Sequence, residues 1–454
     1  LIWAKINGAD VTPIFTDEGL TCEVPSPTDP LVWEAEVEIN PKANTSLEGL
    51  YLSNGMYCTQ CEAEGFRKIT YYPDRPDVMA EFTVRIESDL PVLLSNGAQT
   101  SGAAGWAEWH DPWPKPSYLF ALVAGDLIGV SDTYVDAKNR ETPLHIYVRE
   151  GDQDKTAFAM EALKHAFRWD TEVYGREYDL DAFHIVAVDD FNMGAMENKG
   201  LNIFNSSAVL ASPETATDGN FERIEAIIAH EYFHNWTGNR ITCRDWFQLC
   251  LKEGLTVFRD QQFTADMRSA AVARINDVGD LRGRQFREDA GPLAHPVRPE
   301  SFVEINNFYT STVYEKGAEV VRMLKTLLGD EIYFDAVARY FRLHDGQAVT
   351  IEDWLTCFEV VAKTDLSQFK QWYSQAGTPH LLVREAYRDG QYTLHFTQET
   401  KPTPGQDTKL PQVMPIVVGL LDATSGAELL PSTTLKMPQA EQSFRFAAAT
   451  GKPV

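Results

Sequence analysis

Residues 230–234 read His-Glu-Tyr-Phe-His, and Glu253 follows 19 positions after the second histidine. The stretch lies in a helical pattern, and side chains four residues apart lie on one face of a helix. Both imidazoles, His230 and His234, can therefore bind one metal ion. Glu231 comes from the same turn and can reach a water molecule at that ion without being a ligand. The stretch predicts a zinc site that includes its own general base.

A third ligand must come from elsewhere, because catalytic zinc takes three protein ligands and keeps one position open. Glu253 fits this need. It lies in residues 246–255, an apolar stretch that we interpret as a second helix beside the first. The alternative is a buried helix whose histidines bond only to neighbouring protein groups. The placement of Glu253 favours one zinc ion per chain.

The composition narrows the class of protein. The chain has 454 residues, of which 44% are hydrophobic and 23% charged, as in soluble globular proteins. Its net charge of −26 argues against nucleic acid and anionic membranes as partners. The six cysteines are too sparse for a disulfide framework and suit a reducing compartment. The pair Cys58-x-x-Cys61 has no second pair to complete a zinc ribbon, so we interpret it as chance.

No apolar run reaches the length of a transmembrane helix, and no signal peptide pattern is visible. We therefore expect a cytoplasmic protein with no membrane partner. We also expect a monomer. The chain starts at Leu1 and stops at Val454 within a strand-rich segment. We expect it to be truncated at both ends.

The pattern of hydrophobic residues divides the chain into three parts. Residues 1–126 alternate apolar and polar side chains, as in Trp33 to Ile39 and Val78 to Ile86, which predicts a β-rich domain. Residues 127–377 are dominated by helical patterns, and residues 378–454 return to strands. The expected fold is therefore multidomain α+β.

Local signals mark some element ends. Helices are expected over residues 154–175 and 220–238, each ending at a glycine. A further helix is expected from Lys316 onward. Asp389-Gly390 between two strand patterns predicts a β-hairpin.

Four further motifs accompany the histidine helix. Residues 194–200 read Gly-Ala-Met-Glu-Asn-Lys-Gly, residues 235–240 Asn-Trp-Thr-Gly-Asn-Arg, residues 312–317 Thr-Val-Tyr-Glu-Lys-Gly and residues 115–121 Lys-Pro-Ser-Tyr-Leu-Phe-Ala. Together with His-Glu-x-x-His and Glu253, they resemble the aminopeptidase N family of zinc metallopeptidases (gluzincins), and its bacterial branch most of all. The resemblance runs over essentially the whole chain. It implies a β-rich N-terminal domain, a thermolysin-like catalytic domain and part of a β-sandwich.

The resemblance also implies roles for further residues. Tyr314 matches the tyrosine that stabilises the oxyanion, and Glu197 and Glu62 match carboxylates that bind the free α-ammonium group of a peptide. The backbone between Gly194 and Asn198 is expected to pair with the substrate as an added strand. Gln60 and Met193 are expected to line the first side-chain pocket, where an adaptable methionine favours broad specificity. The expected substrate-binding residues are Gln60, Glu62, Met193, Gly194, Ala195, Met196, Glu197 and Asn198.

The function implied by the resemblance is release of N-terminal amino acids from peptides with a free N-terminus. Water is the attacking group and Glu231 the general base. Three alternatives remain open from the sequence. They are a gluzincin endopeptidase, an epoxide-hydrolysing relative, and a catalytically silent fragment that only binds peptides.

Overall fold

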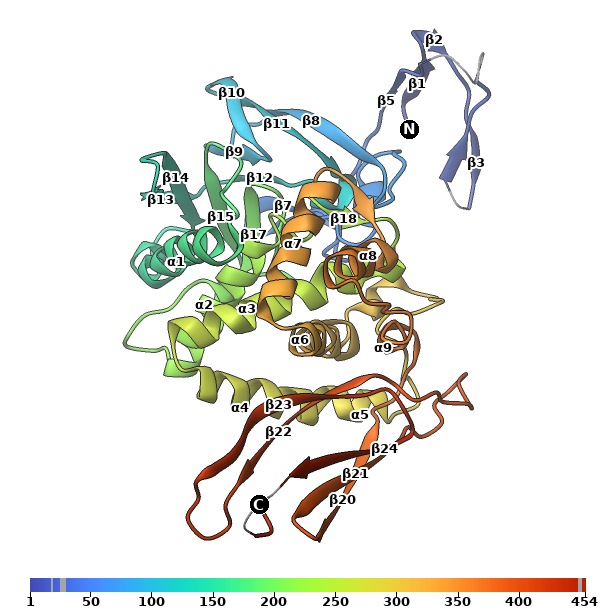
Figure 1. Cartoon of the computed structure of the whole chain (residues 1–454). Coiled ribbons are helices and arrows are strands. Elements are labelled where there is room, and N and C mark those ends of the chain that lie inside the picture. Colours follow the sequence, from blue (N-terminus) through green and yellow to red (C-terminus); the bar gives the residue numbers. More distant parts are fainter. Residues whose placement is uncertain (18, 25–29, 448–450) are drawn as a thin grey trace. The chain divides into compact units, whose positions relative to one another are not determined.

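The computed structural model describes residues 1–17, 19–24, 30–447 and 451–454. The chain divides into two compact units, Leu1–Asn235 and Trp236–Val454. The first unit combines several sheets with two long helices, whereas the second begins with helices and ends in strands (Figure 1). No helix of the described residues has both the length and the apolar character that a membrane span requires.

Four small antiparallel sheets make up the first part of unit 1, in agreement with the predicted β-rich segment. Their strand orders are β2-β1-β5, β3-β4, β6-β7-β12-β9 and β10-β11-β8. The strands are β1 (Trp3–Ile6), β2 (Ala9–Asp10), β3 (Ile14–Thr16), β4 (Gly19–Thr21), β5 (Trp33–Glu36), β6 (Gly49–Ser53), β7 (Met56–Gln60), β8 (Met79–Glu87), β9 (Val92–Ser95), β10 (Ala98–Ala103), β11 (Trp106–Pro116) and β12 (Leu122–Gly125).

Alternation of side chains explains how these strands build a core. Phe82 and Val84 on β8 point to the same face, two residues apart, and pack against a cluster of Cys61, Phe66 and Phe120. The Phe66 and Phe120 rings meet edge to face, with centroids 5.2 Å apart. The same inward positions were visible in the sequence as an apolar residue at every second position.

A five-stranded sheet opens the segment in which helical patterns dominate. Its order is β13-β14-β15-β17-β16, with β14, β15 and β17 parallel. The strands are β13 (Ile128–Val135), β14 (Glu141–Val148), β15 (Phe183–Val188), β16 (Ala195–Met196) and β17 (Leu201–Asn205). All six residues of β15 are buried. A strand covered on both faces has no polar alternation, so its period of two does not appear in the sequence.

Two helices pack side by side in unit 1: α1 (Ala157–Tyr174) and α2 (Asp218–Phe233) (Figure 1). Gly175 ends α1 in the left-handed conformation at φ 65°, as predicted. Thr217 and Asn220 form a capping box at the start of α2. The prediction that this helix runs to Gly238 is wrong, because it ends at Phe233. Two residues further on, the Asn235 side chain bonds to Lys199 and Asp179 in a buried polar network.

Unit 2 begins with mostly helical elements. Residues 246–255 do not form one α-helix as predicted. A 3₁₀ helix is followed by α3, which starts at Glu253. The elements are η6 (Trp246–Leu251), α3 (Glu253–Met267), α4 (Ala270–Asp280), η7 (Leu281–Gln285), α5 (Phe286–Asp289), η8 (Ile305–Phe308), η9 (Thr312–Lys316), α6 (Gly317–Leu328), α7 (Asp330–His344), α8 (Ile351–Ala362) and α9 (Gln371–Ser374), with the strand pair β18 (Thr242–Cys243) and β19 (Ala348–Val349).

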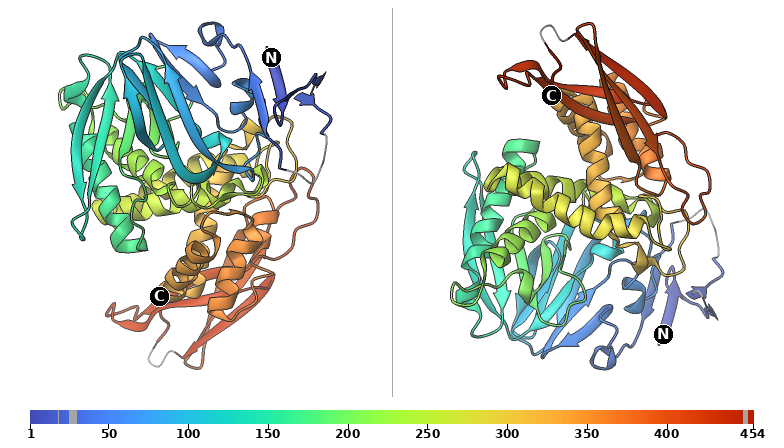
Figure 2. Two further views of the ribbon diagram at one scale, coloured as in Figure 1. Left: turned by 90° about the horizontal axis from the view of Figure 1, so that it is seen from above. Right: turned by 90° about the horizontal axis from the view of Figure 1, so that it is seen from below.

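The last part of unit 2 consists of strands, shown in orange to red in Figure 2. They are β20 (His380–Arg388), β21 (Gln391–Glu399), β22 (Met414–Leu421), β23 (Glu428–Met437) and β24 (Glu441–Ala447), in the sheets β20-β21-β24 and β22-β23. Asp389 and Gly390 form the predicted two-residue hairpin turn, with φ of 52° and 73°. Phe396, Leu435 and Met437 are buried between the two sheets as a common core.

Candidate metal and peptide site

The end of α2 separates an aromatic face from a polar face. The Tyr232 ring stacks on Phe167 of α1 with centroids 4.2 Å apart, and the Phe233 ring lies 4.9 Å from that of Trp169. These contacts fix the rotation of the helix about its axis. His230 and His234 then lie one above the other, because positions i and i+4 share a face of a helix, and Glu231 points about 100° from His230, away from the two aromatic residues. Packing of two aromatic residues therefore orients three polar ones.

The two histidines converge on one point. Their Nε2 atoms are 2.9 Å apart, and the rings are nearly perpendicular at 83°. Two nitrogens bound to one tetrahedral zinc ion at about 2.0–2.1 Å lie about 3.3 Å apart. A displacement of a few tenths of an ångström would give the spacing that zinc needs, so this pair fits the metal.

Three buried carboxylates of unit 1 form a cluster that reaches His234. Ligand atoms of Glu197, Glu231 and His234 all lie within 4.8 Å of one another, and carboxylate oxygens of Glu62 and Glu197 are equally close. The exposed fractions of Glu62, Glu197 and Glu231 are 6%, 3% and 7%. Like charges this close in a buried site repel each other, so the cluster favours a cation as its ligand.

Glu197 follows the short strand β16, which lies at the edge of the five-stranded sheet and pairs on one side with β17. An edge strand offers backbone N–H and C=O groups to an extended peptide. Asn198 is fully buried, as is Lys199, and neither amide atom of its side chain has a hydrogen-bond partner among the described residues.

Gln60 and Met193, both expected in the side-chain pocket, are in contact. The Gln60 Nε2 atom lies 3.3 Å from the sulfur of Met193 and 3.7 Å from that of Met196. Gln60 is buried at the end of β7, two residues before Glu62. A strand of the N-terminal sheets therefore brings these residues to the segment 193–197.

A buried ionic network connects this segment to the end of α2. The Lys199 Nζ atom donates to both carboxylate oxygens of Asp179, at 2.9 and 2.8 Å, and to Oδ1 of Asn235 at 2.9 Å. Asn235 in turn donates to Asp179 at 3.0 Å. The sequence analysis did not identify this network. Lys199 and Asn235 stand inside two quoted motifs, but nothing in the sequence indicated Asp179 as their partner.

In unit 2, Glu253 is the first residue of α3 and is 2% exposed. Its Oε1 accepts a hydrogen bond of 2.5 Å from the buried Lys252 Nζ. The next residue, Gly254, lies so close to Gly317 that a Cβ atom on it would meet the Gly317 backbone at 2.9 Å. Glycine at both positions thus allows α3 to pack directly on the start of α6.

Tyr314 lies on η9, a single turn of π-helix that leads into α6. Such turns are rare and occur often at functional sites. Two buried residues of this turn are anchored elsewhere in unit 2. Gln285 donates to Thr312 Oγ1 at 3.3 Å, and Lys316 donates to Asp289 at 2.7 Å. The Tyr314 side chain, which is only partly buried, therefore projects from a fixed backbone.

Glu315, beside this tyrosine, is in an unusual environment. Burial raises the pKa of its carboxyl group to about 7, and the favourable interaction with Arg284 offsets only part of that effect. Its Oε2 atom has no hydrogen-bond partner among the described residues. Glu315 was not identified from the sequence, where a glutamate beside a tyrosine carries no such signal.

Comparison with known proteins agrees with these features. Residues 158–373 match the peptidase family M1 domain, residues 15–119 the peptidase M1 N-terminal domain, and residues 377–454 a domain of unknown function, DUF3458, with an Ig-like fold. The chain belongs to the peptidase M1 family. The resemblance to aminopeptidase N is confirmed, and so is the multidomain α+β fold with a β-rich start, a helical M1 domain and an Ig-like end.

Among relatives of this M1 chain, aminopeptidase N of Caulobacter vibrioides is 60% identical over 366 residues, which is 79% of this chain and 42% of the relative. Aminopeptidase N of Escherichia coli is 53% identical over 92% of this chain and 50% of its own length. A solved structure, Legionella pneumophila aminopeptidase A in complex with aspartic acid, has a TM-score of 0.89 and 34% identity over 100% of this chain and 52% of that chain. The chain thus spans about half the length of the relatives it matches.

Proposed function

We propose that this protein is a zinc-dependent aminopeptidase that removes amino acids one at a time from the N-terminus of peptides. The observation that carries the proposal is the buried pair Glu62 and Glu197 beside Glu231. An α-ammonium group between these carboxylates would supply charge-assisted hydrogen bonds and relieve their repulsion. An endopeptidase has no positive charge of its substrate to place there.

His230, His234 and Glu253 are the proposed zinc ligands, and their side-chain types suit that ion. Bound there, zinc would lower the pKa of a water molecule and polarise the scissile carbonyl group. The converging Nε2 atoms of the histidines support this assignment. So does the buried position of Glu253 at the start of α3.

Glu231 accepts a proton from the attacking water and passes it to the leaving amine. Its buried position near Glu197 and His234 supports this role. Tyr314 donates a hydrogen bond to the oxyanion of the tetrahedral intermediate. The anchored π-helical turn that carries Tyr314 suits a donor whose position must not change during the reaction.

The substrate backbone pairs with the segment Gly194–Asn198, for which the edge position of β16 is suitable. Gln60 and Met193 form part of the wall of the first side-chain pocket. The flexible methionine leads to broad specificity. The Legionella relative was solved with aspartic acid, a free amino acid, which is the kind of product this reaction yields.

We also propose a cytoplasmic location and a monomeric enzyme. The six cysteines are all free, and five of them are buried, as expected in a reducing compartment. The proposed domain borders are those predicted from the sequence: 1–126, 127–377 and 378–454.

The test compares one peptide with its N-acetylated twin, which lacks the positive charge. Mass spectrometry of timed samples should show single residues leaving the free peptide, while the acetylated peptide stays intact. A chelator should stop the reaction and added zinc should restore it. The variant Glu197→Gln should lower kcat/KM on the free peptide by about 10- to 100-fold, as for loss of a charged hydrogen bond. Glu214→Gln, at an exposed glutamate before α2, is the matched control and should have no effect.

Cleavage of the acetylated peptide at internal bonds would identify an endopeptidase instead. Zinc-independent peptide binding without any turnover would identify a silent binding protein.

A further inference from the structure

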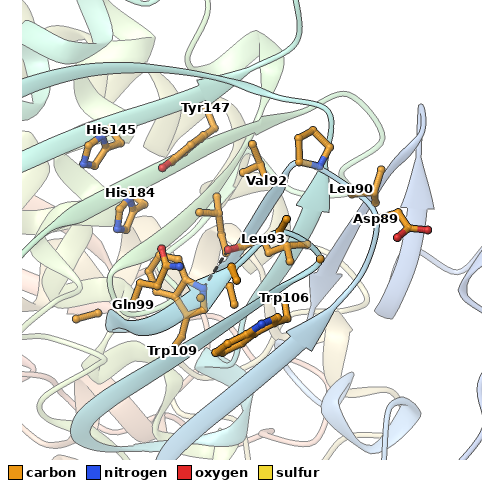
Figure 3. A pocket seen from close by; sticks show the side chains of 18 of the residues that line it. Asp89, Leu90, Val92, Leu93, Gln99, Trp106, Trp109, His145, Tyr147 and His184 are labelled. Atoms are coloured by element: carbon orange, nitrogen blue, oxygen red, sulfur yellow. Dashed lines mark hydrogen bonds between the residues drawn. The ribbon is translucent and has the colours of Figure 1, made fainter.

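A cavity of about 840 Å³ lies within unit 1 (Figure 3). Such a volume is typical of small-molecule sites. The cavity is bounded by β9, the β10–β11 hairpin and the strands β14 and β15. It is lined by Asp89, Leu90, Pro91, Val92, Leu93, Leu94, Ala98, Gln99, Gly102, Ala103, Ala104, Gly105, Trp106, Ala107, Trp109, His145, Tyr147, Ala182 and His184.

Planar rings form one wall of this cavity. His145 and His184 stack almost in parallel, with centroids 5.0 Å apart and an interplanar angle of 14°. Trp109 meets His184 edge to face at 5.6 Å, and Tyr147 lies 6.0 Å from the same ring. The Trp109 indole is fixed by a 3.0 Å hydrogen bond to the Leu93 carbonyl group, drawn in Figure 3. The rings of His145 and Tyr147 are only partly buried, so a flat molecule can stack on this part of the wall.

His184 has unused hydrogen-bonding capacity. The residue is 5% exposed, and its Nδ1 atom has no hydrogen-bond partner among the described residues. Burial, together with neighbouring His145, lowers the pKa of His184 to about 3, so the ring is neutral at physiological pH. A buried polar atom without a partner is unfavourable. His184 lines the cavity, so a ligand bound there would be the partner that this nitrogen lacks.

The charges of the residues that line the cavity argue against an anionic ligand. Of the described residues that line the cavity, Asp89 is the only Asp, Glu, Lys or Arg. Arg85 stacks on the ring of Trp106 at 4.2 Å, but its charge is paired with Glu87 at 2.8 Å. The described residues of the lining thus include no lysine or arginine to neutralise an anionic ligand, and the chain as a whole carries a net charge of −26.

We propose that this cavity binds a planar aromatic molecule that carries a hydrogen-bonding group and no negative charge. The ring stacks on the wall formed by His145, His184 and Tyr147, and its polar group pairs with His184. None of the residues proposed for zinc binding or peptide hydrolysis lines the cavity. The site is therefore independent of the proposed peptidase activity.

Three related probes test the proposal by isothermal titration calorimetry on the full chain. They are 2-oxindole, a flat neutral molecule with an N–H and a carbonyl group; indene, which has the same shape without polar atoms; and 2-oxindole-5-carboxylate, which is anionic. None has an amine that could occupy the proposed ammonium site. We expect 2-oxindole to bind with a Kd below about 1 mM, within the range for a ligand of about ten non-hydrogen atoms. Indene should bind about 3- to 10-fold more weakly, and the carboxylate more weakly still.

Two variants locate the binding. His184→Phe keeps a ring in the wall and removes the nitrogens, so it should abolish the preference for 2-oxindole over indene. Ala182→Phe fills the cavity beside β15 and should abolish binding of both. His395→Phe, on β21 of unit 2, is the matched control and should change neither affinity. Circular dichroism establishes that each variant is folded.

Absence of binding by all three probes would overturn the proposal. Equal affinity of 2-oxindole for the wild type and Ala182→Phe would place the binding elsewhere on the protein. An unchanged preference in His184→Phe would refute the role of the imidazole, and tight binding of the carboxylate would refute the argument from charge.

Discussion

The buried imidazole of His184 should make the protein sensitive to mild acid. Its pKa is lowered to about 3 by burial, with a smaller effect from the neighbouring His145, whereas the unfolded chain has the ordinary value near 6.5. Protonation of His184 is therefore less favourable in the folded protein than in the unfolded chain. The stability that depends on neutral His184 is fully present above pH 6.5. It decreases as the pH falls from 6.5 toward 3.

The size of the effect follows from the two pKa values. At pH 5.0 the imidazole of the unfolded chain is about 97% protonated, and the folded one remains neutral. The corresponding loss in the free energy of unfolding between pH 7.5 and 5.0 is about 2 kcal/mol. This is a considerable fraction of the roughly 5–15 kcal/mol that stabilises a typical domain.

Urea unfolding at pH 7.5 and 5.0, followed by tryptophan fluorescence, measures this loss. The variant His184→Phe cannot bind the proton, so it should lose about 2 kcal/mol less than the wild type over the same interval. His380→Ala, at an exposed histidine of β20, controls for the removal of a histidine as such. Equal losses in the wild type and His184→Phe would refute the reasoning.

Three other changes test the proposed catalytic and structural roles. Glu231→Gln should retain zinc, measured by metal analysis, but lower turnover by about 10²- to 10⁴-fold, and an activity near that of the wild type would contradict the general-base role. Tyr314→Phe should lower kcat by about 10²- to 10³-fold in steady-state assays, whereas a change in KM alone would exclude oxyanion stabilisation. Asp289→Ala leaves the buried Lys316 without its 2.7 Å partner, so urea unfolding should show a loss of about 3–5 kcal/mol. Asp289→Leu combined with Lys316→Met should recover much of this stability, and a loss below about 1 kcal/mol in the single variant would show that the pair does not hold the turn.

Several features could be predicted because they depend on residues close in sequence. Four residues make one helical turn, so the spacing of His230 and His234 already places both on one face. Gly175 ends α1, and Asp389 with Gly390 forms the hairpin turn, because each requires only a backbone conformation that these residues adopt readily. The family could also be identified, since several short motifs occurred together in one chain.

The predicted end of α2 was wrong, and two further features were not predicted, because tertiary contacts override local pattern. Nothing in residues 220–238 shows that α2 must end at Phe233, where Asn235 joins Lys199 and Asp179. β15, which is apolar except for His184, carries no period by which a strand could be told from a buried helix. The π-helical turn at Tyr314 depends on anchors elsewhere in unit 2, and a sequence window does not include them.

The sequence by itself determined the helix of His230, Glu231 and His234 and the family to which the chain belongs. The tertiary structure alone brought Glu62 within 4.8 Å of Glu197, across 135 positions of the chain, and built the aromatic cavity around His184. The physical reason is that helical and strand periods act over a few residues. Burial of charge and stacking of rings instead depend on which distant segments pack together, and only the folded chain decides that.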